Sequence, residues 1–152
     1  MISAPLTKNF GRFAVSLLLF ISLPCLAACG SRQTVQTGQG EEEEPLSRTE
    51  FTERIENFFE YDPLKVGKTS QFLIHLTDLT DGTPVEKAEV TLAIRPNGGG
   101  AEVGTVKARV GKVTGIYVAD VTVAKFGNYD IEFRVRNAKL DERMALKDFK
   151  AE

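Results

Sequence analysis

The feature that most constrains the fold is a strict alternation of apolar and polar residues in the stretch 128–137, NYDIEFRVRN. Successive side chains of a β-strand point to opposite faces, so this pattern is typical of a strand with one buried face. A helix would repeat every 3.6 residues and would mix the two classes on each side. The buried face is predicted to hold Tyr129, Ile131, Phe133 and Val135.

Three further stretches have strand character. The stretches 88–96 (AEVTLAIRP) and 115–124 (GIYVADVTVA) alternate in the same way, and 71–79 (QFLIHLTDL) is apolar on both faces, as expected of a central strand covered on both sides. Turn-forming Gly, Pro, Asn and Asp residues separate these runs, and no long segment has the helical period. The sequence therefore predicts an all-β fold, an Ig-like antiparallel β-sandwich of about seven strands.

Two details refine this prediction. Gly127-Asn128-Tyr129 lies just before the clearest strand and resembles the tyrosine corner of Ig-like sandwiches, in which a Tyr hydroxyl bonds to nearby backbone. The C-terminal stretch 140–152 (LDERMALKDFKAE) has mixed periodicity, which leaves a last strand, a short helix and a tail open.

The N-terminus has the three-part plan of a secretory signal: a basic start with Lys8 and Arg12, an apolar core at 13–23, and small residues before Cys29. This core is shorter than the roughly 20 residues that a membrane-spanning helix needs. The run Leu26-Ala27-Ala28-Cys29 resembles the lipobox of bacterial lipoproteins, which implies cleavage before Cys29 and lipid attachment to its sulfur. An uncleaved anchor and an unmodified Cys29 are the alternatives.

Removal of residues 1–28 would leave a chain with no cysteine for pairing, so the fold must rely on its core. The leader holds two of the 19 basic residues and none of the 21 acidic ones, which leaves 17 against 21 and argues against a nucleic-acid partner. The stretch 30–45 (GSRQTVQTGQGEEEEP) is too polar to fold. We assign 1–28 to the signal peptide, 29–47 to a lipidated flexible tether and 48–152 to the sandwich.

The sequence gives little support for a metal-binding or catalytic site. The predicted mature chain has one His and one Met, so it cannot assemble the four N or S ligands of a structural zinc site within one copy. His75 is the one candidate for a metal ligand or a general base. The favoured interpretation of His75 is a structural one, a half-buried strand histidine that bonds to neighbouring backbone or carboxylate groups. No nucleotide or hydrolase motif is present, so we expect no enzyme and no cofactor.

A family resemblance covers about residues 51–137. The blocks "PL-VG--S-F--HLTDL" and "-PV--A-V" resemble the N-terminal domain of heavy-metal-type RND efflux periplasmic adaptor (membrane fusion) proteins. The most specific block is HLTDL at 75–79, and we interpret it as a structural signature in which Thr77 and Asp78 cap the following turn. The matching residues are Tyr61, Pro63, Leu64, Val66, Gly67, Ser70, Phe72, His75, Leu76, Thr77, Asp78, Leu79, Pro84, Val85, Ala88 and Val90, then Gly115, Tyr117, Ala124, Gly127, Tyr129 and Ile131.

The resemblance implies a non-catalytic, lipid-anchored module of the bacterial periplasm that docks onto cation-efflux components or another periplasmic protein. A full adaptor also has a helical hairpin, a lipoyl-like part and a β-barrel, and this sequence has no heptads that would build the hairpin. We therefore expect either part of a split or truncated adaptor or a standalone lipoprotein, in the outer or the inner membrane. The alternative function is a periplasmic copper- or zinc-type metal-handling lipoprotein that uses His75.

Overall fold

The computed structural model describes residues 43–152, and the predicted signal peptide, the lipid-accepting Cys29 and most of the tether lie outside the described residues. The described part is all-β and contains no helix long and apolar enough to cross a membrane. Its strands are β1 (Leu46–Phe51), β2 (Ile55–Tyr61), β3 (Thr69–Asp78), β4 (Thr83–Pro84), β5 (Glu89–Pro96), β6 (Gly104–Lys107), β7 (Arg109–Val110), β8 (Ile116–Thr122), β9 (Gly127–Arg136) and β10 (Asp141–Ala151).

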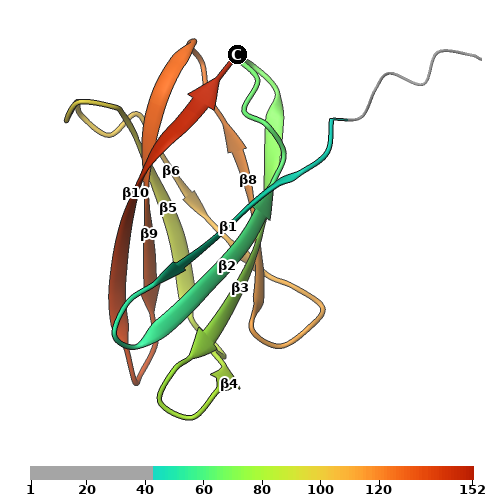
Figure 1. Ribbon diagram of the computed structural model, residues 1–152, viewed down its shortest axis with the longest axis vertical. Helices are drawn as coiled ribbons and strands as arrows, with labels where there is room; N and C mark the ends of the chain where they lie inside the picture. The colour runs from blue at the N-terminus through green and yellow to red at the C-terminus, as the bar shows by residue number, and fades with distance from the viewer. Residues whose placement is uncertain (1–42) are drawn as a thin grey trace, which may run out of the picture. The chain divides into compact units, whose positions relative to one another are not determined.

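The strands form two antiparallel sheets that pack as an Ig-like sandwich (Figure 1). The first sheet has the order β1-β2-β3-β8-β7, with β4 paired to β3, and the second has the order β10-β9-β5-β6. With β2 taken as strand A, this is the ABED and CFG division of Ig-like domains. Strand β1 is an addition outside strand A, and it begins at Leu46, two residues before the predicted start of the sandwich.

The core lies between the inner faces of the two sheets and confirms the alternation expected from the sequence. An aromatic cluster joins the sheets: the ring centroids of Phe59 and Phe133 are 4.8 Å apart across the two sheets, and those of Tyr61 and Phe72 are 4.9 Å apart within the first sheet. Such pairs contribute beyond the apolar area that they bury. The largest fully buried side chains are Tyr117, Phe59, Phe72, Phe133, Phe149, Ile55, Leu64, Ile74, Leu76, Leu92, Ile94 and Ile131.

The sequence predicts that both faces of β3 are covered, but the structure covers only one of them. Phe72, Ile74 and Leu76 point into the core, whereas Leu73 and His75 are half-buried on the solvent side of the first sheet. No described residue forms a layer over that side. The outward residues are shielded by their cross-strand neighbours, because a central strand is flanked on both edges.

The C-terminal stretch is a full strand with a β-bulge, which explains its mixed periodicity. The register against β9 shifts between Leu146 and Phe149, and Asp148 adopts a positive φ of 67°. One extra residue at a bulge restores the inward direction of the side chains that follow. Phe149 is therefore fully buried although it lies three residues after the inward-facing Leu146.

Tyr129 forms a tyrosine corner at the start of β9. Its hydroxyl donates a 2.8 Å hydrogen bond to the backbone carbonyl of Lys125, four residues upstream. The ring itself is buried. The hydrogen bond fixes the connection from β8 to β9 against the end of the core, as in other Ig-like sandwiches.

The two ends of the sandwich are built differently. The tether pole contains the start of β1, the β2–β3 turn (62–68) and the C-terminus; there Lys65 pairs with Glu43 at 2.9 Å, and the Val66 amide donates to the Glu152 carbonyl. The loop pole contains the β3–β5 connection (79–88) and the β9–β10 hairpin (137–140). The ten residues of β3 run between the poles, a distance of about 30 Å. Figure 1 shows the C-terminus at one end and the β4 region at the other.

Candidate functional site

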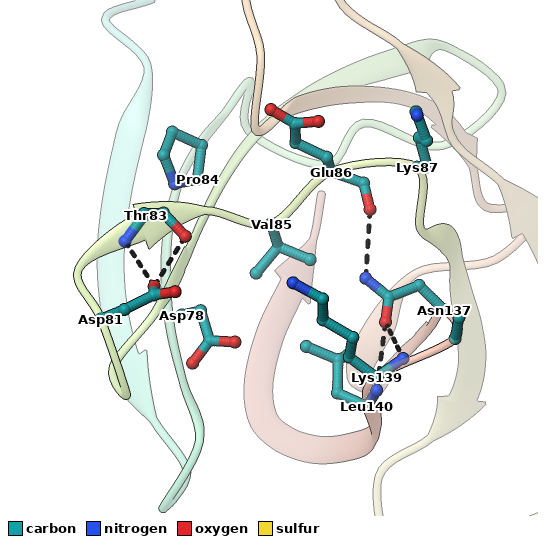
Figure 2. Close-up of a pocket in the computed structure, with 11 residues that line it drawn as sticks. Asp78, Asp81, Thr83, Pro84, Val85, Glu86, Lys87, Asn137, Lys139 and Leu140 are labelled. Atoms are coloured by element: carbon teal, nitrogen blue, oxygen red, sulfur yellow. Dashed lines mark hydrogen bonds between the residues drawn. The ribbon is translucent and has the colours of Figure 1, made fainter.

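A recess of about 580 Å³ opens at the loop pole, and we call it the pole pocket (Figure 2). It lies between the β3–β5 connection and the β9–β10 hairpin, two loops that occupy the same end of the sandwich as the B–C and F–G loops of Ig variable domains. Its lining mixes carboxylates, ammonium groups and apolar side chains: Asp78, Asp81, Thr83, Pro84, Val85, Glu86, Lys87, Asn137, Ala138, Lys139 and Leu140.

The first wall of the pocket is held by two consecutive Asx turns. Oδ1 of Asp78 accepts hydrogen bonds from the backbone amide and the hydroxyl of Thr80, at 2.9 and 2.6 Å. Oδ1 of Asp81 accepts the equivalent pair from Thr83, at 3.0 and 2.6 Å. Carboxylate-to-backbone bonds of this kind fix a loop without regular secondary structure. The expected turn cap is thus formed by Asp78, while Thr77 takes part through its backbone pairing with Pro84.

Asn137 forms the second wall and ties it to the first. Its Oδ1 accepts hydrogen bonds from the amides of Lys139 and Leu140, at 2.8 and 3.0 Å, which closes the hairpin turn. Its Nδ2 donates to the Glu86 carbonyl at 3.1 Å, across the pocket. Figure 2 shows these three bonds converging on one amide group. A single side chain therefore sets the spacing of the two loops.

Tyr117 supports the pocket from below. Its buried hydroxyl donates to the Val85 carbonyl at 2.8 Å and accepts from the Ala88 amide at 3.0 Å. Between these two bonds the chain passes through Lys87, which has a positive φ of 50°. That conformation is uncommon for a residue with a side chain, and it persists where the surroundings hold it. The hydrogen bonds of Tyr117 supply that constraint.

The charges of the pocket are of both signs. The Thr80 hydrogen bonds lower the pKa of Asp78 below its usual value, and the Thr83 hydrogen bonds lower the pKa of Asp81 in the same way. Lys139 adds a smaller effect in the same direction on both carboxyl groups. Both carboxylates are therefore ionised at neutral pH and face an ammonium group across the recess. The floor is apolar, since Val85 and Leu140 are buried.

His75 does not line the pole pocket. It lies on the solvent side of the first sheet, where its ring meets Phe58 edge-on at a centroid distance of 5.3 Å. Its Nε2 is buried and has no hydrogen-bond partner among residues 43–152, so the expected bond to backbone or a carboxylate is absent at that atom. The same residues contain no group of three or more His, Cys, Asp or Glu side chains arranged to hold a metal ion.

The residues that carry the family resemblance are partly core residues, such as Phe72 and Ile131, and partly residues that shape turns. The Ser70 hydroxyl is buried and donates to the Pro63 carbonyl at 3.0 Å, while Gly67 has a φ of 72° that favours glycine in the β2–β3 turn. Leu64 is buried beside the last strand. Sequence reasoning did not single out Asn137 or Lys139 for the pocket. The available signal was an asparagine directly after a strand, which favours a turn.

Comparisons with known proteins give a structural neighbour of low similarity. No family model matches the chain, and no curated protein matches it. Among solved structures, a ZirS C-terminal domain aligns with 96% of this chain and 94% of its own length, at a TM-score of 0.40 and 14% sequence identity. The fold assignment above therefore rests on the strand order and register of this chain.

Proposed function

We propose that this chain is a non-catalytic, lipid-anchored module of the bacterial periplasm that docks onto another envelope protein through its loop pole. The observation that carries the proposal is the position of the pole pocket. The chain enters the sandwich at the tether pole, where Leu46 lies opposite Tyr61, and the pocket opens at the other end. A module anchored through Cys29 would present this recess away from its membrane.

The tether supports the same proposal. A tether of 16 residues that is flexible, as the composition of 30–45 predicts, would have an end-to-end distance of about 20–25 Å and would keep the sandwich close to the membrane. Anchoring at one point raises the effective concentration of the module near any membrane-bound partner. Modest affinity at the pole is then sufficient for stable association.

The composition of the pocket favours a protein partner over a small substrate. One oxygen of Asp78 and one of Asp81 are engaged in turn hydrogen bonds, and the apolar floor is rimmed by Lys87 and Lys139. An apolar centre inside a charged rim is the usual plan of a docking surface. The resemblance to RND adaptor domains makes components of a cation-efflux system the partners that we propose. No specific observation among residues 43–152 favours the metal-handling alternative.

A photo-crosslinking experiment tests this function. The full chain would carry a photoreactive amino acid in place of Lys139, at the rim of the pole pocket, in cells that express the efflux pump and its adaptor. We expect an adduct that mass spectrometry identifies as one of these components. The matched control places the same amino acid at Lys68, which is exposed at the tether pole. Equal yields at both positions, or no adduct with an envelope protein, would contradict the proposal.

The anchor needs a separate test. Cys29→Ser in the full chain removes the sulfur that the lipobox resemblance assigns to the lipid. We expect the wild-type chain to incorporate a labelled fatty acid and to sediment with membranes, and the variant to do neither. Cys25→Ser is the control, because Cys25 lies inside the predicted signal peptide and is expected to leave with it. Membrane retention and labelling of the Cys29→Ser chain would refute the anchor.

A further inference from the structure

Three of the four edge strands in the sandwich are protected against pairing with another chain, and β1 is not. Strand β6 has four residues and β7 has two, and β10 is interrupted by the bulge at Asp148. Short edges and bulges are the usual devices against edge-to-edge association. Strand β1 has six residues in unbroken register with β2, and it contains neither Lys nor Pro.

Both ends of β1 carry exposed large apolar side chains. Leu46 is 48% exposed and Phe51 is 63% exposed, although each belongs to a regular strand. A long, unbroken edge with exposed apolar residues is a ready template for another strand. The described residues provide no strand on that side of β1. The question is therefore which strand fits it.

The charges of β1 answer this question. Arg48 and Glu50 point toward the inner side of the sheet, because they lie opposite Phe59 and Asn57 of β2, which face the core. Inward charges normally block edge pairing. Here the two charges have opposite sign and flank Thr49. An antiparallel pair of two β1 strands centred on Thr49 sets Arg48 of each copy opposite Glu50 of the other.

The neighbouring symmetric registers are worse. A pair centred on Arg48 or on Glu50 would place identical charges directly opposite each other, which is destabilising. A pair centred between two residues would set inward side chains of one copy opposite outward side chains of the other. Such a register is disfavoured, because directly opposite residues of paired strands point to the same face of the sheet. The register centred on Thr49 also places the two Thr49 side chains together and covers Phe51 with Ser47 of the second copy. Threonine pairs are favourable across antiparallel strands.

We propose that β1 forms the contact of a symmetric homodimer, in which the β1 strands of two copies pair antiparallel about a two-fold axis at Thr49. The first sheets of the two copies then form one continuous sheet. In the single chain Arg48 already pairs with Glu50 at 2.8 Å and donates to the Lys147 carbonyl at 2.8 Å. The dimer adds a second carboxylate to each guanidinium. It uses none of the residues that line the pole pocket.

Cysteine cross-linking tests the dimer and its register. Residues directly opposite in an antiparallel pair have Cα atoms about 4.5–5.5 Å apart, which is within disulfide reach. The full chain with Thr49→Cys, treated with a thiol oxidant in intact cells, should therefore form a covalent dimer. Ser47→Cys is the matched control, because the two copies of residue 47 would be about 13 Å apart in this register. We expect about ten-fold more dimer from Thr49→Cys, above the background of the unsubstituted chain.

A charge exchange adds a second test in the Thr49→Cys background. Arg48→Glu alone and Glu50→Arg alone should each reduce cross-linking, because every cross-copy pair then joins like charges. Co-expression of the two variants should restore it, since their heterodimer pairs Arg48 with Glu50 on one side and the exchanged charges on the other. Recovery requires both variants to be folded, so it separates lost pairing from misfolding.

The outcomes are decisive in either direction. Equal cross-linking of Thr49→Cys and Ser47→Cys, or none from Thr49→Cys, would overturn the dimer. Failure of two folded charge variants to recover on mixing would overturn the register. If either charge variant does not fold, the cysteine comparison decides alone. Failure of the photo-crosslink at Lys139 does not bear on the dimer, because that experiment reports on the pole pocket and no residue of β1 lines this pocket.

Discussion

At the scale of single residues, the least expected feature of the core is Asn57. It points inward from β2, is fully buried, and lies beside Leu76 of β3. Neither its Oδ1 nor its Nδ2 has a hydrogen-bond partner among residues 43–152. Burial of an unpaired amide opposes folding, so Asn57 lowers the stability of this core.

Replacement of Asn57 by Leu should therefore stabilise the protein. Leucine has a similar volume and no polar atoms to leave unpaired, and we expect a gain of about 1–3 kcal/mol in the free energy of unfolding. Urea denaturation measures it. Asn137→Leu is the control, because that amide makes three hydrogen bonds, and it should lose stability instead. A loss in the Asn57→Leu variant would show that the amide is paired in solution.

The titration of Glu132 gives a second prediction at this scale. Hydrogen bonds from Arg134 and then Arg95, at 2.5 and 3.0 Å, hold the pKa of Glu132 below its usual value. A lowered folded-state pKa gives stability that is present above the unfolded value, about 4.3, and is lost as the pH falls through the folded value.

Glu132→Gln should therefore lower stability at neutral pH, by no more than about 1 kcal/mol for such a surface pair. The gap between variant and wild type should close as the pH falls below about 4. Thermal unfolding at a series of pH values measures both trends. A gap that stays constant with pH would mean that the carboxylate charge is not the source of the effect.

At the scale of elements, the β3–β5 connection depends on β8 for its shape. The Tyr117 hydroxyl satisfies two backbone groups, of Val85 and Ala88, that would otherwise be buried without partners. A side chain from a strand thereby determines the form of a loop in the neighbouring layer. These two hydrogen bonds hold the loop that forms one wall of the pole pocket.

Tyr117→Phe removes this support and keeps the ring. We expect a loss of about 1–3 kcal/mol in the free energy of unfolding, because one donor and one acceptor lose their partner. Amide hydrogen exchange should rise in residues 79–88 and stay unchanged in β9. Tyr129→Phe is the matched control, since its hydroxyl bonds to Lys125 at the tether pole. It should lose stability without faster exchange at 79–88.

Some strands could be predicted from the sequence and others could not, for different physical reasons. The buried face of β9 follows from strict alternation, because local periodicity and tertiary packing agree there. The sequence does not decide the structure of β10, since a bulge at Asp148 breaks the period within one strand. The sequence does not separate the start of β1 from the tether, because LSRTEF shows only weak alternation and pairs through its backbone.

At the scale of the whole molecule, stability depends on one core between two sheets. The described residues contain no cysteine, so no disulfide contributes to their fold. We therefore expect the same urea midpoint with and without a reducing agent. A midpoint that falls in the presence of reductant would mean that Cys25 or Cys29 forms a structural bond in the full chain.

The sequence by itself determined the fold class, the identity of most inward-facing residues, and the absence of local motifs for catalysis, because these depend on patterns a few residues long. Tertiary structure alone decided which loops share a pole, that Asn137 and Tyr117 shape one pocket, and that Arg48 and Glu50 face inward from an unprotected edge. These relations join residues far apart in the chain. Sheet order and register create them, and local sequence does not encode them.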